Sequence, residues 1–464
     1  MRAPLPRREP PPPTPSREGR GRVQTIRSYP SEAPPVTAEA ASAPPAGSRA
    51  AIFGWCLYDW AMSAFNTVIG TFVFSVYFTK GIVGDADRGA ALWGVAAGSA
   101  GIAVALLSPV LGAVADHGGR RKAWLAACVA AAVVPTALLW FAAPEPSWIL
   151  PAMVLVGLAT IAFELSYVFY NALLIDVAPP GKLGRVSGWG WGLGYFGGLL
   201  CLVIALFGLI GFGGAAPLLP LPAVDSAGPR ATGPLVALWW LVFALPLLLL
   251  VRERPGGAPI RAAIRRGLDD LWRTLESLPG RGNLVRFLVG SAIYREGFNM
   301  LFAFGGIYAA GALGLDFGQL VLFAIGLNVT SGVGSVLFAW VDDAIGSKPT
   351  ILIAIVGLVV LGVPIILVTD PVWFIGLALV LGLFLGPAQA ASRTLMGRLA
   401  PVGGEAEAYG LYGLTGRATG FVGPWLFAAA TAAFATQRAG VAAIVVLFAL
   451  GGLIVATVRE PARG

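Results

Sequence analysis

The residues of this sequence that could do chemistry are ionisable side chains inside long apolar runs. Asp59, Glu164, Arg295, Glu296 and Arg417 all lie well within such runs. A charged group in the middle of a bilayer costs roughly 2.5–3.5 kcal/mol on insertion scales, so each one needs a partner or a water-filled cavity. Charges of both signs in such places are typical of pathways for solutes and protons. They can also act as clamps between helices.

Polar residues recur around these charges at helical spacing. Side chains at positions i, i+4 and i+7 share one face of a helix, and the first, fourth, seventh and tenth apolar runs each carry such a stripe. The stripes are Asp59, Ser63, Asn66 and Gly70; Thr160, Glu164, Tyr167 and Asn171; Arg295, Asn299 and Gly306; and Gly382, Gly386, Gln389 and Arg393. One run in three is the arrangement expected for the walls of a central cavity built from three-helix units. We therefore expect the polar and charged side chains of the stripes, together with Glu296 and Arg417, to bind a solute or a coupling proton.

The buried charges do not balance. Three carboxylates, those of Asp59, Glu164 and Glu296, face two guanidiniums, those of Arg295 and Arg417. Arg417 could pair with Asp59 or with Glu164, and the spacing does not choose between them. Burial favours the protonated form of a carboxylate that has no partner, so we expect Asp59 or Glu164 to take up and release a proton during transport. Facilitated diffusion without a proton is the alternative.

Other kinds of chemistry have little support in the sequence. His117 is the only histidine, and Cys56, Cys128 and Cys201 lie separately in apolar runs, so no disulfide framework, metal site or bound cofactor is expected. A Walker motif for ATP is also missing. We expect no enzyme activity. A membrane-embedded enzyme or lipid-handling protein, or a receptor that does not transport, are the alternatives.

The elements that must position these side chains are membrane-spanning helices. The chain has 464 residues, of which 57% are hydrophobic and 12% are charged, against roughly 25% charged in soluble domains. Helices are expected because lipid offers no partners to backbone N–H and C=O groups, and a crossing needs about 20 residues. Twelve runs are long enough: 51–79, 91–115, 122–143, 148–174, 187–211, 235–251, 284–313, 318–341, 349–369, 372–395, 408–434 and 439–458.

Lysines and arginines predict the orientation of these spans. With the amino terminus inside, the inner loops and the carboxyl terminus hold seventeen of them, Arg393 and Arg398 included, whereas the outer loops hold four. Cytoplasmic loops are rich in Lys and Arg, so both termini are expected in the cytoplasm. The net charge of +8 then mostly reflects the lysines and arginines of the cytoplasmic segments. No nucleic-acid partner is expected, because no folded domain gathers a basic face.

Three segments lie outside the spans. Residues 1–50 are rich in proline and arginine and poor in large apolar residues, which predicts a disordered cytoplasmic tail. Residues 252–283 link one six-span bundle, 51–251, to a second, 284–458, which a short tail, 459–464, follows. Apolar residues in the linker recur at helical spacing, which predicts an amphipathic helix at the membrane surface. They are Ile264, Leu268, Leu271, Trp272, Leu275 and Leu278.

A loop motif follows the second span and recurs after the eighth. The first copy is LGAVADHGGRRK (111–122), with Gly112, Asp116, Gly119, Arg120, Arg121 and Lys122, and the second copy holds Asp343, Gly346 and Lys348. An aspartate at the end of one helix can accept hydrogen bonds from N–H groups at the start of a neighbouring helix. The repeat indicates that one half of the chain was duplicated. A simple helix hairpin with positively charged residues is the plainer interpretation.

The first copy resembles the cytoplasmic loop signature of the major facilitator superfamily, which implies a latch that closes the cytoplasmic side. Ala339 and Ser347 depart from that signature, so we expect a weaker latch in the second half. Longer stretches resemble the autophagy-related protein 22-like branch of the superfamily. They are WCLYDWAMSAFNTVIGTFVFSVYF (55–78), FYNALLIDVAPPGKLGRVSGWGWGLGYFGG (169–198), FGGIYAAGALGL (304–315), LNVTSGVGSVLFAWVDDAIGSKP (327–349), GLFLGPAQAASRTLMGRLAP (382–401) and GLYGLTGRATGFVGP (410–424).

The patterns and the resemblance together predict an all-α integral membrane protein. We expect twelve transmembrane helices in two pseudo-symmetric six-helix bundles, the major facilitator fold. The expected function is a monomeric secondary transporter, a permease or effluxer, that moves a small polar solute by alternating access with proton coupling. Eukaryotic members of the branch are associated with amino-acid export from the vacuole, so the resemblance implies amino acids as one solute class. The bacterial relatives that this chain more resembles imply a bacterial inner membrane.

Overall fold

The computed structural model describes residues 47–211, 215–219, 221–222, 226–252, 258–315, 317–420 and 422–461. Its helices all belong to one unit, Ala43–Gly464. The expected disordered tail, 1–50, lies outside the described residues except for its last four positions. The last residues of the short tail 459–464 also lie outside them.

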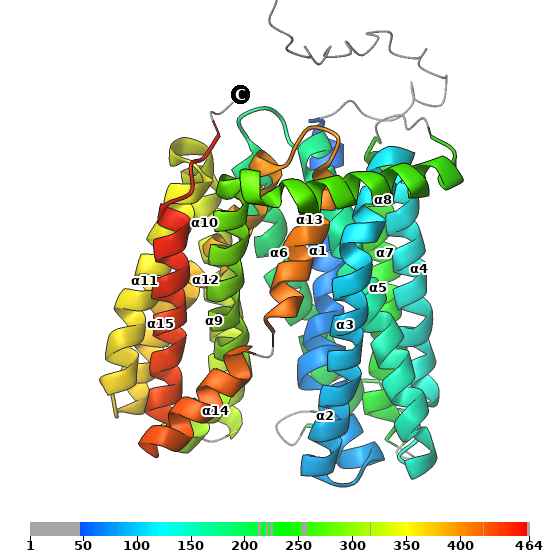
Figure 1. Cartoon of the computed structure of the whole chain (residues 1–464). Helices are drawn as coiled ribbons and strands as arrows, with labels where there is room; N and C mark the ends of the chain where they lie inside the picture. The colour runs from blue at the N-terminus through cyan, green and yellow to red at the C-terminus, as the bar shows by residue number, and fades with distance from the viewer. Residues whose placement is uncertain are drawn as a thin grey trace, which may run out of the picture. The chain divides into compact units, whose positions relative to one another are not determined.

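The first half of the chain forms one helix bundle (Figure 1). Its first span begins with α1 (Arg49–Ala64) and continues through π-helical turns and α2 (Phe74–Tyr77) to Ile82. The other helices of this bundle are α3 (Ala86–Gly118), α4 (Arg121–Leu138), α5 (Ile149–Val177), α6 (Leu183–Val203) and α7 (Ala227–Leu250). Helix α7 begins before the expected 235, so the sixth span has an ordinary length of 24 residues.

The second half forms the other bundle, shown in yellow-green to red in Figure 1. Its helices are α9 (Gly282–Leu313), α10 (Phe317–Ile345), α11 (Ser347–Leu367), α12 (Pro371–Leu399), α13 (Glu405–Ala418), α14 (Val422–Phe434) and α15 (Gln437–Ala456). Helix α8 (Ile260–Ser277) lies across one end of the spans. We call this the α8 end and the opposite one the far end.

Ten helices in the described part of the chain are long and apolar enough to cross a membrane. Two expected spans are not among these ten. The run 284–313 corresponds to α9, which carries the charges of Arg286, Arg295 and Glu296, and the run 408–434 is divided between α13 and α14. The all-helical fold with two bundles is confirmed, and the eleventh run differs from the prediction because it is interrupted near Thr419.

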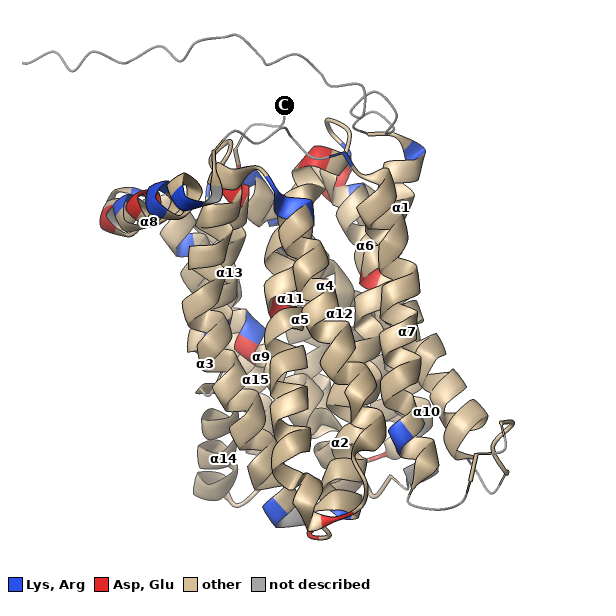
Figure 2. Cartoon of the chain, turned by 90° about the vertical axis from the view of Figure 1, so that its right-hand side faces the viewer, with Lys and Arg blue, Asp and Glu red and all other residues tan. Residues whose placement is uncertain are grey.

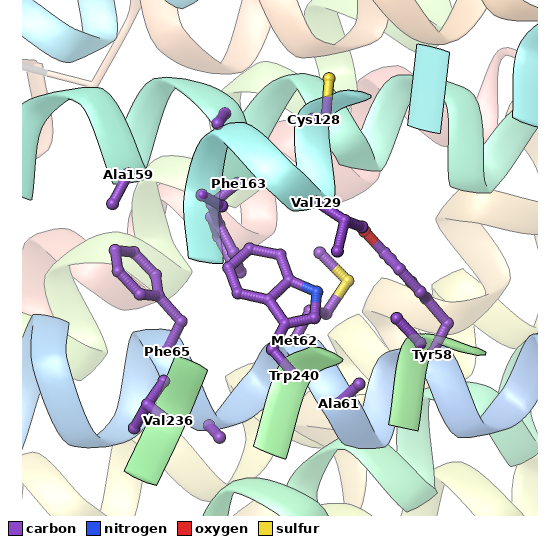
Figure 3. Close-up of a cluster of buried hydrophobic side chains, with 14 of the residues drawn as sticks. Tyr58, Ala61, Met62, Phe65, Cys128, Val129, Ala159, Phe163, Val236 and Trp240 are labelled. Carbon is purple, nitrogen blue, oxygen red and sulfur yellow. The ribbon is translucent and has the colours of Figure 1, made fainter. Parts of the chain in front are cut away.

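Each bundle has its own apolar core. In the first bundle the rings of Phe65 and Phe163 lie 5.8 and 5.7 Å from the ring of fully buried Trp240, and Figure 3 shows this cluster with Met62 between the helices. The second core consists largely of side chains from α9 to α15. Val168 and Ala172 of α5 pack with the second core, so the boundary between the bundles is partly apolar, and its polar groups lie between these contacts.

Helix α8 lies where the sequence predicts an amphipathic helix in the linker. Leu271 is buried against Ala113 of α3 and Leu411 of α13, whereas Trp272 is 65% exposed. Figure 2 shows charged residues along α8 and at the two ends of the spans, with a few inside the spans. Those few buried charges form the candidate site.

Candidate functional site

A buried ion pair joins the two bundles. The Nη1 of Arg393 on α12 lies 2.8 Å from Oδ2 of Asp59 on α1. The hydroxyl of Tyr170 on α5 donates to the same oxygen at 2.8 Å. Both charged residues are only 2% exposed, so each depends on the other to offset its lost hydration.

The first bundle surrounds the Arg393 guanidinium. Its Nε and Nη2 donate to the hydroxyl and the carbonyl oxygen of Ser187 on α6, at 3.0 and 2.6 Å. The guanidinium carbon lies 4.7, 5.5 and 4.8 Å from the ring centres of Trp55, Tyr170 and Trp191. Such distances allow cation–π attraction. An arginine from the second bundle thus fills a polar and aromatic socket in the first.

One sequence prediction about this pair is wrong, and one alternative that the sequence left open is decided. The count of inner-loop cations includes Arg393, but α12 extends to Leu399 and buries this side chain inside the helix bundle. The partner of Asp59 is Arg393, not Arg417. The error arises because the tenth run was expected to end at 395, which placed Arg393 beside a loop.

A second ion pair joins the bundles at mid-span. Arg417 of α13 contacts Glu164 of α5, which is one of the two pairings that the sequence left open. Their side chains are 36% and 22% exposed. Arg417 is twelve residues from the start of α13, about 18 Å along a helix, so the pair lies near the middle of a bilayer of about 30 Å. This pair, unlike the first, is accessible.

Arg295 and Glu296 of α9 are neighbours in the chain with different partners. The Nη1 of Arg295 donates to the carbonyl oxygen of Tyr412 at 2.8 Å, and its guanidinium lies 4.4 Å from the Tyr412 ring centre. The Glu296 carboxylate accepts from Asn299, Thr419 and the backbone N–H of Gly423. The charge count in the sequence analysis is therefore corrected. Glu296, rather than Asp59 or Glu164, has only neutral hydrogen-bond donors in the contacts described here.

The remaining residues of the stripes are distributed over the boundary between the bundles. Asn66 and Asn299 are exposed, and Ser63 and Tyr167 are half-buried. Gln389 of α12 donates to the Tyr195 hydroxyl of α6 at 3.0 Å and so joins the bundles. Asn171 is 9% exposed, and its Oδ1 has no hydrogen-bond partner in the described part of the chain.

The first loop motif holds the start of α13 at the α8 end. Both carboxylate oxygens of Asp116 accept from the backbone, at 3.1 Å from Ala406 and 2.8 Å from Glu407. Arg121 is 6% exposed and contacts Asp116, Asp176 and Glu405. An aspartate from one bundle thus caps a helix of the other, which is the geometry that the motif predicts.

The other members of the first motif have separate tasks. Gly119 ends α3 with a φ of 57°, which glycine adopts without strain. Gly112 lies against the backbone of Ala406, so the two helices approach closely. Lys122 donates to the carbonyl oxygen of Val251 at 2.6 Å, and Arg120 is exposed.

The second motif forms the reciprocal contact. Asp343, at the end of α10, accepts from the backbone N–H of Arg185 at 3.1 Å, and the Arg185 side chain lies 3.2 Å from it. Ala339, which stands where the first motif has Gly112, packs against Gly188 of α6. In this second contact the glycine that allows the close approach therefore lies on the facing helix, α6, rather than on the helix that carries the motif. Gly346 precedes α11, and Lys348 lies in its first turn, where its N–H donates to Glu460.

Several residues of the site were not among those predicted from the sequence. Tyr170, Ser187 and Trp191 form the socket around Arg393, and Asp176 and Glu405 complete the Arg121 cluster. One signal was present: Glu405 is an acidic residue just before an apolar run, where a helix begins. The aromatic residues carry no such signal, because tryptophan and tyrosine occur in many of the spans.

The site holds charges and hydrogen bonds rather than metal-ion ligands. No group of three or more His, Cys, Asp or Glu side chains within the described ranges is placed to bind a metal ion. The polar groups lie at the boundary between two bundles, from the α8 end to mid-span. Such an arrangement can bind a charged solute and can open or close as the bundles move.

Comparison with protein families gives two matches. Residues 181–462 match the family described as "Vacuole effluxer Atg22 like", and residues 3–202 match the Major Facilitator Superfamily. The chain is 26% identical over 409 residues to the uncharacterized MFS-type transporter YxiO of Bacillus subtilis, covering 88% of this chain and 94% of that protein. It is 25% identical over 267 residues to autophagy-related protein 22 of Cryptococcus neoformans, covering 52% of this chain but only 46% of the fungal protein.

Solved structures of major facilitator transporters have the same fold. The proton:xylose symporter XylE, bound to 6-bromo-6-deoxy-D-glucose, superposes with a TM-score of 0.68 at 16% identity, covering 89% of this chain and 96% of XylE. FucP in its outward conformation gives 0.67 at 12% identity, with 89% and 99% covered. At these identities the likeness concerns the fold alone.

Proposed function

Because the chain belongs to the family of proteins like the vacuole effluxer Atg22, we propose that it moves a small charged solute between its two bundles by alternating access, coupled to protons. The family and the fold make the chain a multi-pass membrane protein and a secondary transporter rather than an enzyme. The finer proposal depends on one observation, the pair of Glu164 and Arg417. It lies at mid-span, joins the bundles and leaves both side chains partly exposed.

The contacts at the α8 end support alternating access. A transporter of this fold opens to either side in turn around a site at mid-span. The Asp116 and Asp343 contacts and the Asp59–Arg393 pair join the two bundles toward the α8 end, which supports a state in which this end is closed. We propose that these contacts break when residues 51–251 and 284–458 move as two bodies on the linker 252–283.

The distribution of charge supports an orientation. Lysines and arginines are concentrated at the α8 end, and a cytoplasmic surface carries this excess. We propose that the α8 end and both termini are cytoplasmic. The Bacillus subtilis relative makes the inner membrane of a bacterium the proposed location. The two bundles enclose the proposed site without a second copy, so we propose a monomer.

The solute we propose is zwitterionic or anionic. A solute carboxylate would bind the Arg417 guanidinium, and an ammonium group would bind the Glu164 carboxylate, in the strong manner of charge-assisted hydrogen bonds. Exposed Asn66 and Asn299 offer further hydrogen bonds. Amino acids satisfy this requirement, and the description of the family favours export as the direction.

A thermal-shift screen of the purified chain tests the proposal. The panel contains amino acids, organic acids, sugars and nucleosides. A ligand at a hundred times its Kd adds about 2.7 kcal/mol to apparent stability, so one amino acid or organic acid should raise the Tm. Counterflow of that compound in proteoliposomes should then detect transport.

Matched variants separate binding at this site from binding elsewhere. E164Q and R417Q should lose the shift and the counterflow. E145Q, which changes an exposed glutamate before α5, should keep both. If sugars or nucleosides alone bind, or if E164Q and R417Q bind as the wild type does, the proposed solute site is wrong.

A further inference from the structure

Glu296 differs from the other carboxylates inside the spans. It is 2% exposed, and its three described hydrogen-bond donors are neutral. Oε1 accepts from Asn299 Nδ2 at 3.3 Å and from the Thr419 hydroxyl at 3.1 Å, and Oε2 accepts from the N–H of Gly423 at 3.2 Å. Arg295 attracts this carboxylate by charge but donates its hydrogen bond to Tyr412 instead. Burial without an ion-pair partner favours the protonated form of a carboxylate.

The charged groups of the surrounding helices are engaged elsewhere. Arg295, the neighbour in α9, is directed to Tyr412 of α13, and α14 has no ionisable residue. The charged groups with partners on the other neighbouring helices are Arg417 with Glu164 and Glu405 with Arg121 on α13, Arg393 with Asp59 and Arg398 with Glu460 on α12, Asp342 with Arg398 and Asp343 with Arg185 on α10, and Arg438 with backbone oxygens on α15. Arg286 of α9 and Glu407 of α13 lie near the starts of their helices, toward the α8 end.

Glu296 lies where the eleventh span is interrupted. Helix α13 ends at Ala418 and α14 begins at Val422. The Glu296 carboxylate binds Thr419 with one oxygen and Gly423 with the other, so it bridges the break. Arg417, two residues before Thr419, contacts Glu164 of the other bundle. A change in the protonation of Glu296 can therefore reach Arg417 of the proposed solute site through the short segment between Arg417 and Thr419.

We propose that Glu296 is the residue that binds the coupling proton, and that its protonation acts on Arg417 through the break between α13 and α14. The proposal rests on the transport function proposed above. A proton from water binds one carboxylate oxygen, and the resulting O–H becomes a donor. That oxygen is then a weaker acceptor for Thr419 or Gly423, so the break loosens and the Arg417–Glu164 pair is freed for exchange with solute.

The proton has a route to this carboxylate. Asn299 is exposed and lies one helical turn beyond Glu296 toward the far end of α9. It donates to Glu296, so it connects the buried carboxylate with the exposed side of the helix. We infer that the proton enters from the far end and leaves after the bundles have reversed.

Distances between spin labels test the proton site without a known solute. For this experiment the three cysteines of the full chain are replaced by alanine, and spin labels are attached at Ala91 of α3 and Ala312 of α9. Both positions are exposed at the far end. In the parent protein the distance distribution should differ between an acidic and an alkaline buffer, because only the charged carboxylate of Glu296 accepts fully from both Thr419 and Gly423. E296Q should show the low-pH distribution in both buffers, and E145Q should respond as the parent does.

Two further measurements keep the test decisive. E296D restores a carboxylate, so the pH response should return, and size-exclusion profiles show whether each variant is folded. Once a solute is found, E296Q should lose at least about tenfold of pH-driven accumulation yet keep counterflow, because exchange needs no net proton movement.

The possible results separate the two proposals. A pH response that survives in E296Q, or its absence from the parent protein, overturns the proton site. A response that depends on Glu296, in a protein that carries none of the solutes in the panel, overturns the proposed transport function alone.

Discussion

The pair of Asp59 and Arg393 allows a quantitative test of alternating access. Asn in place of Asp59 keeps the shape of the side chain but leaves the Arg393 guanidinium without a counter-ion at 2% exposure. Removing one partner of a buried ion pair costs about 3–5 kcal/mol. The lower value applies here, because Arg393 keeps two hydrogen bonds to Ser187 and three aromatic contacts. The cost falls on the state in which the two bundles meet at the α8 end.

This cost should change the population of states. A loss of about 3 kcal/mol changes the ratio of two states more than about a hundredfold, so a closed-to-open ratio of about 99:1 would approach 1:1. Spin labels at Lys182 and Val402, exposed in loops of different bundles at the α8 end, report the distance across this boundary. We expect a long-distance component in D59N that the wild type lacks.

Two variants serve as controls for D59N. In the double variant D59N/R393Q the unpaired charge is gone, so part of the closed population should return. D370N changes a helix cap at the far end of α12 and should leave the distances as in the wild type. A folded D59N protein with the wild-type distance distribution would refute the idea that this pair holds the α8 end closed.

Three other substitutions test the contacts around the site. Arg121→Gln leaves a cluster of buried carboxylates without its cation and should lower the free energy of unfolding, measured by denaturation, by about 3 kcal/mol or more. Arg120→Gln changes the exposed neighbouring residue and should change that free energy by less than about 0.5 kcal/mol. Gly188→Ala places a Cβ 2.6 Å from that of Ala339. It should destabilise the closed state by about 1–3 kcal/mol and so increase the long-distance component. Gly157→Ala, where the space is open, should leave the distances unchanged. Tyr170→Phe removes one hydrogen bond to Asp59 but keeps the ring. Because both residues belong to the first bundle, the stability of the fold should fall by about 1 kcal/mol in the denaturation assay, while the label distances should stay as in the wild type.

The spans could be predicted from the sequence because hydropathy along a run is a local property. The eleventh run shows the limit of that property. Arg417 is the only charged residue in 408–434, yet the helix is interrupted between Ala418 and Val422. Gly420 and Pro424 are there to signal a break. What holds it is the carboxylate of Glu296, more than a hundred residues earlier, and a hydropathy profile contains no information about that contact.

The pairing of the buried charges could not be predicted for a related reason. Spacing on a helix places a side chain on a face, but it does not determine which distant helix meets that face. Asp59 and Arg393 are 334 residues apart in the chain. The rule that cations mark cytoplasmic loops then assigned Arg393 to a loop. That rule considers only the neighbouring sequence, so it cannot distinguish an arginine near a helix end from one that is buried against another helix bundle.

The two loop motifs show why the contacts at the α8 end should open together. Asp116 of the first bundle holds the start of α13 in the second, and Asp343 of the second bundle holds α6 of the first. Ser108 and Ser187 donate to carbonyl oxygens of Gly410 and Ala390, which continues each interface toward mid-span. A rotation of one bundle against the other changes both interfaces at once, so the cost of opening is their combined stabilisation. A ligand shifts such an equilibrium only by binding one state better than the other. The mid-span groups, Glu164 with Arg417 and the carboxylate of Glu296 beside them, lie where solute and proton can supply that difference.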